Sequence, residues 1–453
     1  MNKDGSDPKD LTPFEEVTVQ IIDDLKNNPD EIIVGINKDN KALHEPYRLN
    51  INSGELEKLA ENNNMLAPMA GWFTDHDGKL RLAAKVKGTD IQILYRRDEA
   101  DGFDTVLTTN FKETMSPLFF DFDNGDIVYA ASNLGRDKQA IVKYNLVTGE
   151  ELEVLYEHDV VDVTDLSFSR KRKVLTAISF VENKRDYVFL DDLSEKVFGH
   201  LKEELGEYEI RITSADDNEE KLIVRTFSDR SMGAYYLYDV TKAELTHIAD
   251  VSGGFNEADM AVVKPIQYKS RDGLTINGYL TLPNGAEAKN LPVVINPHGG
   301  PWARDHWGFN PEVQMLASRG YAVLQMNFRG STGYGRAFQE ASYKQWGQKM
   351  QDDITDGVHW LIEQGIADPE RVAIYGASYG GYATLAGLTY TPDLYRCGVD
   401  YVGVSNLFTF LKTIPPYWKP FLEMMYEMVG HVEKDSAMTV SYTHLRAHET
   451  RRY

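Results

Sequence analysis

The sequence contains a single cysteine, Cys397, which excludes a disulfide framework and any cysteine-rich metal site. It has no apolar run long enough to cross a bilayer, and its first residues lack the apolar segment of a signal peptide. Basic residues are few: 48 Lys and Arg stand against 70 Asp and Glu, so the formal net charge is −22. This charge argues against nucleic acid and against an anionic membrane surface as partners.

The length of 453 residues exceeds what one compact core usually holds, so two or three domains are expected. Hydrophobic residues make up 42% of the chain and charged residues 26%, which is typical of a globular protein.

Residues 1 to about 255 contain an internal repeat in which a polar turn precedes a β-rich run. A second β-rich run follows each of the five, and a period near 45 residues is typical of β-propeller blades. We therefore predict a propeller with about five blades over residues 1–257. The hydrophobic residues that anchor the five units are Ile32, Leu80, Ile127, Leu175 and Leu222.

Aspartate-rich turns at 75–78 and 121–125 raise the question of calcium loops. In the first of them, Lys79 and Leu80 occupy positions where a ligand and an invariant glycine would be needed. We therefore interpret both clusters as ordinary turns, in which Asp side chains accept backbone hydrogen bonds. No metal or cofactor is expected.

The pattern changes after residue 254. A hairpin is predicted over 265–282, followed by strands at 293–296 and 321–326 and a helix ending near Gly320. A long helix over 352–362 precedes a strand at 372–375, and one more strand is predicted over 397–402. Strands that alternate with helices at this spacing indicate a parallel, doubly wound sheet, assigned here to residues 258–439.

Residues 376–380, Gly-Ala-Ser-Tyr-Gly, match the G-x-S-x-G nucleophile elbow between that strand and a helix predicted from Tyr382 onward. A serine on so tight a turn needs small neighbours, and the start of the following helix favours negative charge. Upstream, residues 293–301 form a β-branched strand that ends in His-Gly-Gly-Pro. Such a loop offers a backbone N–H to an oxyanion, so Ser378 is the candidate nucleophile, with Gly299 and Tyr379 as oxyanion donors.

Together with the loop Asn-Phe-Arg-Gly-Ser-Thr-Gly-Tyr-Gly at 327–335, these motifs resemble the prolyl oligopeptidase family of serine peptidases. The His-Gly-Gly-Pro form is closest to its acylaminoacyl-peptidase and dipeptidyl-aminopeptidase-like members. The resemblance implies a β + α/β fold class: an N-terminal β-propeller followed by an α/β-hydrolase domain. It implies that Ser378 attacks a peptide carbonyl to give an acyl-enzyme, while the propeller admits only short peptides. Tyr382 could line the pocket, but we interpret it as a helix-packing residue.

The remaining triad members do not fit the expected pattern. The catalytic acid and base should follow the serine in the sequence, each on a loop after a later strand. Asp400 comes too early, because it is predicted on or beside the next strand. His431 and Asp435 lie too close together in sequence to approach from two strand ends. His298, His306 and His359 precede the serine, and we interpret them as structural or surface residues.

Both ends of the sequence suggest a gene fragment. Residues 10–13 resemble the closing turn of an earlier blade, and residues 440–450 resemble a translated sequencing adapter. We therefore assign 440–453 to a non-native tail and exclude His444 and His448 as catalytic residues. The acid and base are expected to be missing, which would leave this chain inactive. It would also leave an exposed sheet edge and poor solubility.

The expected function is thus a serine peptidase acting on short peptides. Two alternatives stay open: a carboxylesterase on the same site, and a propeller-based binding protein with a degenerate hydrolase domain. Homo-oligomers are a possible assembly. A cytoplasmic location is favoured by the absent signal peptide, although the natural N-terminus is expected to be missing.

Overall fold

The computed structural model of the protein describes residues 4–431 and 433–435. The chain forms two compact units, one of residues 1–136, 140–156 and 413–426 and one of residues 137–139, 157–412 and 427–453. The two compact units do not correspond to the two predicted domains. The domain limits predicted at residues 257 and 439 therefore stay predictions. The tail predicted at 440–453 lies outside the described residues.

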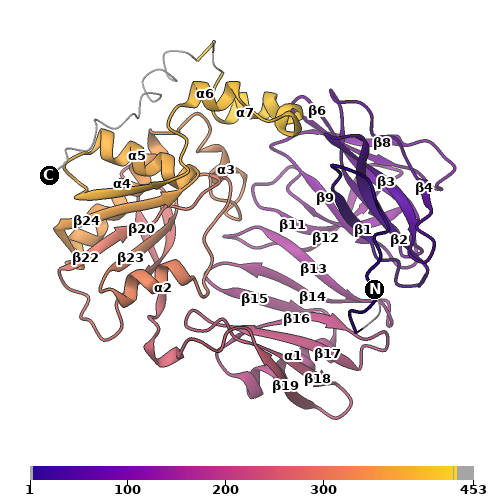
Figure 1. The fold of residues 1–453 in the computed structure, drawn as a ribbon, viewed down its shortest axis with the longest axis horizontal. Helices are drawn as coiled ribbons and strands as arrows, with labels where there is room; N and C mark the ends of the chain where they lie inside the picture. Colours follow the sequence, from indigo (N-terminus) through magenta and orange to yellow (C-terminus); the bar gives the residue numbers. More distant parts are fainter. Residues whose placement is uncertain (1–3, 432, 436–453) are drawn as a thin grey trace. The chain divides into compact units, whose positions relative to one another are not determined.

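The first unit contains three four-stranded antiparallel sheets among its described residues, which we call blades 1 to 3 (Figure 1). Leu82, Phe120, Val128 and Tyr144 are buried in one apolar core that joins blades 2 and 3. The strands of these blades are β1 (Val19–Asp23), β2 (Glu31–Asn40), β3 (Leu43–Asn50) and β4 (Leu56–Lys58); β5 (Met69–Thr74), β6 (Leu80–Lys87), β7 (Asp90–Tyr95) and β8 (Asp104–Asn110); and β9 (Met115–Phe120), β10 (Ile127–Ser132), β11 (Ala140–Asn145) and β12 (Glu150–Tyr156).

Blades 4 and 5 lie in the second unit. Blade 4 has three strands in the described chain, β13 (Val163–Ser169), β14 (Val174–Val181) and β15 (Arg185–Phe189), and the helix α1 (Asp192–Leu205) follows it. Blade 5 consists of β16 (Glu209–Ala215), β17 (Lys221–Phe227), β18 (Ala234–Asp239) and β19 (Glu244–Asp250).

The repeat seen in the sequence is confirmed, because each of its five anchors falls on the second strand of a blade, β2, β6, β10, β14 and β17. The second β-rich run of each unit falls on, or largely on, the third strand. Helix α1 was not predicted. Its signals are the N-cap Asp191, which accepts a hydrogen bond from the Ser194 N–H, and apolar residues at helical spacing, Leu193, Val197 and Leu201.

A six-stranded sheet follows η1 (Glu257–Asp259) in the described part of the second unit, in the order β20-β21-β23-β22-β24-β25. Its last four strands in this order are parallel, as predicted, and the predicted hairpin β20–β21 extends them antiparallel through β23. The strands are β20 (Val263–Lys269), β21 (Thr275–Thr281), β22 (Leu291–Ile295), β23 (Ala322–Asn327), β24 (Ala367–Ala377) and β25 (Cys397–Tyr401).

Helices cover both faces of this sheet: α2 (Pro311–Ser318) lies on one side, and α4 (Lys349–Glu363) and α5 (Tyr379–Tyr390) lie on the other (Figure 1). The buried strands Ala322–Asn327 and Leu291–Ile295 are rich in apolar and β-branched residues, as parallel strands covered on both faces require. The remaining helices are α3 (Arg336–Glu340), α6 (Leu407–Lys412), η2 (Pro416–Phe421) and α7 (Leu422–Met428).

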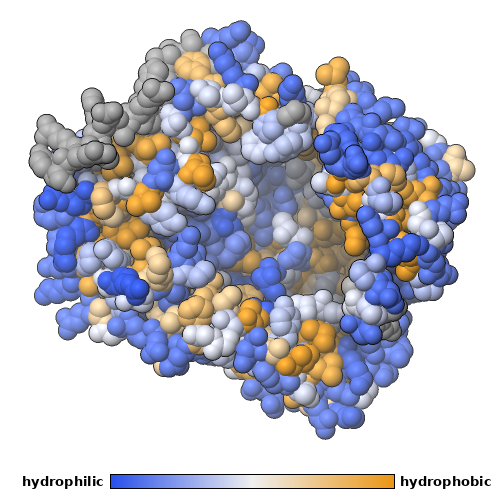
Figure 2. Space-filling model, viewed as in Figure 1, coloured by the Kyte–Doolittle hydropathy of each residue, from blue (hydrophilic) through white to orange (hydrophobic). Residues whose placement is uncertain are grey.

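The face drawn in Figure 2 is largely hydrophilic, with hydrophobic side chains gathered over the region of α1. No helix within residues 4–431 and 433–435 combines the length and the apolar character needed to cross a membrane.

Candidate active site

Ser378 stands at the junction of β24 and α5 with φ 56° and ψ −116°, a backbone conformation that few residues other than glycine adopt. Its side chain is exposed, and its N–H donates a hydrogen bond to the Tyr401 carbonyl at 3.0 Å. Holding a non-glycine residue in this region costs about 1–3 kcal/mol, which the surrounding structure must supply. The junction therefore has the strained geometry of a nucleophile elbow.

The small residues around Ser378 are required by close backbone contacts. A β-carbon on Gly376 would lie 2.4 Å from the Gly380 carbonyl oxygen, and one on Gly380 would lie 2.2 Å from the Pro297 carbonyl oxygen. The predicted start of the helix at Tyr382 is wrong, because α5 begins at Tyr379. Gly380 and Gly381 belong to its first turn, where they allow this tight packing and do not interrupt the helix.

The His-Gly-Gly loop lies directly beside the elbow. The Asn296 side-chain amide donates a hydrogen bond to the Tyr375 carbonyl at 2.8 Å, which links the end of β22 to the end of β24. A β-carbon on Gly299 would lie 3.6 Å from Ser378 Cβ and 3.3 Å from the Ala377 carbonyl oxygen. Two predicted site residues that are 79 positions apart in the sequence are thus brought together by adjacent parallel strands.

His298 supports this loop. Its Nδ1 donates to the Gly299 carbonyl at 2.7 Å, and its Nε2 lies 2.9 Å from Ser331 Oγ. The ring stacks on Phe328 with 4.3 Å between centroids. Burial lowers the pKa of His298 to about 4, so the ring is neutral near pH 7. These contacts agree with the structural role expected for His298, whereas His306 and His359 are exposed.

The side chain of Tyr379 is buried, although its backbone stands next to Ser378. Its ring packs edge-on against Trp346 at 4.6 Å and also contacts Phe328 at 5.3 Å. Tyr382 is fully buried and packs on Trp346 at 5.1 Å, as a helix-packing residue should. The aromatic cluster therefore anchors the first turn of α5, whose residues 379–382 are all buried.

The loop at 327–335 is held by a charge network that was not predicted from the sequence. Arg329 contacts both carboxylate oxygens of Asp353 on α4, at 2.6 and 2.8 Å, and both oxygens of Asp272 in the β20–β21 turn, at 2.9 and 3.0 Å. The backbone N–H of Arg329 also donates to Asp353. The acidic residues at the start of the helix predicted at 352–362 were the only sign of this network in the sequence. No local pattern pairs Asp353 with an arginine 24 positions upstream.

The other candidate acids and bases are engaged elsewhere. Asp400 lies on β25, as predicted, and its Oδ1 accepts a hydrogen bond from the Gly403 N–H at 2.8 Å. His431 and Asp435 share a turn, in which Asp435 Oδ2 accepts from the His431 N–H and from Lys344 Nζ, at 2.8 and 3.0 Å. Within the described ranges, none of these three side chains is hydrogen-bonded to Ser378. His444 and His448 lie outside the described residues.

The aspartate-rich segments of blades 2 and 3 are turns, as predicted. Asp75 Oδ1 accepts hydrogen bonds from the N–H groups of Asp77 and Lys79, and Asp121 Oδ1 accepts from those of Asp123 and Asn124. Over the part of the chain that the structure describes, no group of three or more His, Cys, Asp or Glu side chains is placed to hold a metal ion.

Comparison with known proteins gives the family. The model of the prolyl oligopeptidase family matches residues 307–447. Dipeptidyl aminopeptidase BIII of Pseudoxanthomonas mexicana is 35% identical over 437 residues, which cover 94% of this chain and 63% of that protein. Dipeptidyl peptidase family member 6 of Caenorhabditis elegans is 30% identical over 455 residues, covering 90% of this chain and 59% of that protein. The chain therefore spans about three fifths of the length of these curated relatives.

The fold also matches a solved structure. A puromycin-hydrolyzing peptidase of Mycobacterium tuberculosis superposes with a TM-score of 0.71 at 19% identity, over 92% of this chain and 66% of that one. The resemblance inferred from the three motifs is thus confirmed, and so is the combination of propeller blades with an α/β-hydrolase sheet. The chain belongs to the prolyl oligopeptidase family of serine peptidases.

Proposed function

We propose that the protein is a serine peptidase that cleaves short peptides by acyl transfer through Ser378. The observation that carries this proposal is the exposed serine held at φ 56° between β24 and α5. A strained conformation of this kind persists only where the surrounding structure enforces it, and it is found most often at active sites. The names of the two curated relatives support peptides as the substrate class.

The backbone N–H groups of Gly299 and Tyr379 are the proposed oxyanion donors. Gly299 lies beside Ser378 with no side chain between its backbone and the substrate space. Tyr379 is the first residue of α5, so its N–H has no hydrogen-bond partner within the helix and lies at the positive end of the helix dipole. Donors fixed in this way stabilise the charge of a tetrahedral intermediate without reorganising during the reaction.

A serine hydroxyl needs a general base, and an acid to orient that base. Since Asp400, His431 and Asp435 are engaged in local contacts, we propose that the base and the acid lie outside residues 4–435. The 453-residue chain is then expected to react slowly, while a longer product of the same gene that carries both groups reacts fast.

A fluorophosphonate probe tests the proposal, because it reacts with an activated serine. The longer gene product should be labelled at Ser378 and its Ser378→Ala variant should not, with the labelled peptide identified by mass spectrometry. The 453-residue chain should be labelled at least tenfold more slowly. Rapid labelling of the 453-residue chain would contradict the absence of a base, and no labelling of the longer product would contradict the peptidase.

Substrate type needs a second measurement. The longer product should release the reporter group from an aminoacyl-peptide or an N-acylaminoacyl substrate with a higher kcat/KM than from a simple alkyl ester. A preference for the ester would favour a carboxylesterase on the same site. If the longer product cleaves none of these substrates, a propeller-based binding protein would be favoured.

A further inference from the structure

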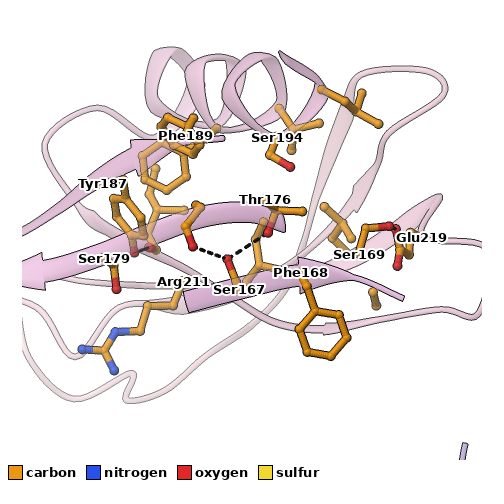
Figure 3. Close-up of a pocket in the computed structure, with 18 of the residues that line it drawn as sticks. Ser167, Phe168, Ser169, Thr176, Ser179, Tyr187, Phe189, Ser194, Arg211 and Glu219 are labelled. Atoms are coloured by element: carbon orange, nitrogen blue, oxygen red, sulfur yellow. Dashed lines mark hydrogen bonds between the residues drawn. The ribbon is translucent and has the colours of Figure 1, made fainter. Parts of the chain in front are cut away.

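Blades 4 and 5 of the second unit border a half-open cavity of about 620 Å³. Its walls come from β13, β14 and β15 of blade 4, from α1, and from β16 of blade 5 (Figure 3). This volume is in the range that small-molecule sites occupy. None of the residues that line it belongs to the elbow or to the His-Gly-Gly loop, so it is separate from the candidate active site.

The cavity exists because the wall of blade 4 carries small and polar side chains. Ser167 pairs with Ala177 across β13 and β14, and Ser179 pairs with Tyr187 across β14 and β15. The corresponding space between blades 2 and 3 is filled by large apolar residues. Interiors normally pack without voids larger than a water molecule, so a space of this size needs a specific cause.

Helix α1 supplies the rest of the explanation by packing against both blades. Phe198 contacts the rings of Tyr187 and Phe189 on β15, with 4.6 and 5.2 Å between centroids. Val197 and Leu201 belong to the apolar core of blade 5. The helix thus occupies one part of the space between the two sheets, and the small side chains of blade 4 leave the other part open.

The end of the cavity near Tyr187 and Ser179 carries Arg185 and Arg211, and the carboxylates of Asp165 and Glu209 lie beside Arg185. Arg185 Nη1 contacts Asp165 at 2.8 Å, but Arg185 Nε is buried and makes no hydrogen bond. Arg211 is exposed and stacks over Phe227 at 5.2 Å, and no carboxylate of the described residues forms an ion pair with it. Figure 3 shows Arg211, Ser179 and Tyr187 at one end of the cavity and Glu219 and Ser169 at the other.

The pKa of a nearby histidine, His306, is affected by the same arginines. The pKa of His306 falls to about 4, first because part of its ring is desolvated although the residue is exposed overall, and then because the guanidinium groups of Arg304, Arg185 and Arg211 lie near it. Arg185, Arg211 and Arg304 therefore lie within electrostatic reach of one ring, and the exposed Arg211 is the guanidinium placed to attract an anion.

We propose that this cavity binds the carboxy-terminal aromatic residue of a short peptide. The aromatic ring packs among Tyr187, Phe189 and Phe198, which offer edges and faces at aromatic-pair distances. The terminal carboxylate pairs with the Arg211 guanidinium, which is exposed and forms no ion pair with a carboxylate of the described residues, since guanidinium groups pair well with carboxylates. This site is independent of the chemistry at Ser378 and does not require the protein to be a peptidase.

Calorimetric titration of the 453-residue chain with N-acetyl-L-tryptophan and with N-acetyl-L-tryptophanamide tests the proposal, because the two probes differ only in the carboxylate. The acid should bind with a dissociation constant in the micromolar to millimolar range and the amide at least tenfold more weakly. Equal binding of the two, or no binding of the acid in the millimolar range, would overturn it.

Two variants locate the binding site on different walls of the cavity. Arg211→Gln removes one cation, and Ser167→Leu places a branched side chain in the empty space; each should weaken binding of the acid at least tenfold. Both residues are exposed, but Ser167 Oγ is hydrogen-bonded to the Ala177 carbonyl and to Thr176 Oγ1, so a small fall in melting temperature is expected for Ser167→Leu and none for Arg211→Gln. Arg319→Gln, an exposed arginine at the end of α2, is the matched control and should leave binding unchanged. Unaltered binding in Ser167→Leu would place the ligand elsewhere and overturn the proposal.

Discussion

Arg329 and Asp353 form a buried ion pair whose side chains are 3% and 0% exposed, with 2.6 Å between Nη2 and Oδ1. The pair joins the loop after β23 to α4, and that loop also carries Ser331, the hydrogen-bond partner of His298. A charge network remote from the serine thereby helps to fix the loop on which Gly299 lies.

Breaking this pair should destabilise the second unit strongly. Asp353→Asn leaves the buried guanidinium with Asp272, whose side chain is 36% exposed, as its remaining counter-charge, so the free energy of unfolding is expected to fall by up to about 3–5 kcal/mol. Urea denaturation of the variant and the parent chain measures the difference. Asp368→Asn, which removes the half-buried partner of the exposed Arg371, is the control and should cost less than about 1 kcal/mol. Equal costs for the two substitutions would refute the assignment of a buried charge.

Two glycines should respond in opposite directions to the same substitution. A β-carbon on Gly380 would collide with the Pro297 carbonyl oxygen at 2.2 Å, so Gly380→Ala should destabilise the protein by at least about 2 kcal/mol. Gly199, in the middle of α1, has no atom within 4 Å of that position, so Gly199→Ala should stabilise by about 0.5–1 kcal/mol. Melting temperatures of both variants provide the comparison, and a shift of the same sign in both would contradict it.

Asp191 should contribute to stability in a defined pH range. Its ion pair with Arg172 lowers the pKa of the carboxyl to about 2, aided by hydrogen bonds from Ser194, whereas the unfolded value is about 3.9. The stabilisation is therefore present above pH 4 and is lost as the pH falls from about 4 to about 2; two pKa units correspond to about 2–3 kcal/mol.

Asp191→Asn keeps a helix-capping side chain but removes the charge. At pH 7 the variant should unfold at a lower urea concentration than the parent chain, and at pH 2.5 the two midpoints should approach each other. A difference in urea midpoint that is the same at both pH values would show that the ionised Asp191 carboxylate does not cause the stabilisation.

Gly299 should tolerate no branched side chain if its N–H serves an oxyanion. Gly299→Val would place methyl groups beside Ser378, and loss of one oxyanion donor usually lowers kcat by about 100-fold to 1000-fold. The rate is measured on the reporter substrate in the longer gene product. Gly102→Val, at a position with open space around it, should retain the parent rate. A Gly299→Val variant with full activity would remove Gly299 from the proposed site.

The edge strand β25 should promote association of the 453-residue chain. Within the described residues it pairs with β24 alone, and Val399 and Tyr401 are 57% and 60% exposed. Val399→Lys places a charge on this edge and should reduce light scattering of the concentrated protein. Met315→Lys, which charges an exposed residue on α2, should have a smaller effect. Equal effects would indicate a general influence of charge on solubility.

Much of the fold was predictable because its signals are local. The repeat placed its anchors on the second strand of all five blades, since turn residues and β-branched runs encode hairpins over short distances. The strand, the tight turn and the helix around Ser378 were equally readable, because the steric limits of that turn act on neighbouring residues. The start of α5 was missed by three positions, because its two glycines look like a turn until the approach of Pro297 is known.

The tertiary structure decided what depends on residues far apart in the chain. The contact between Gly299 and Ser378, the pairing of Arg329 with Asp353, and the space beside Ser167 and Ala177 all arise when separate strands and helices pack together. A sequence lists the side chains that these places contain, but the distances among them are set only by packing of the whole unit. For this protein, the candidate nucleophile could therefore be named from the sequence, whereas the support of its loop and the cavity between blades 4 and 5 required the structure.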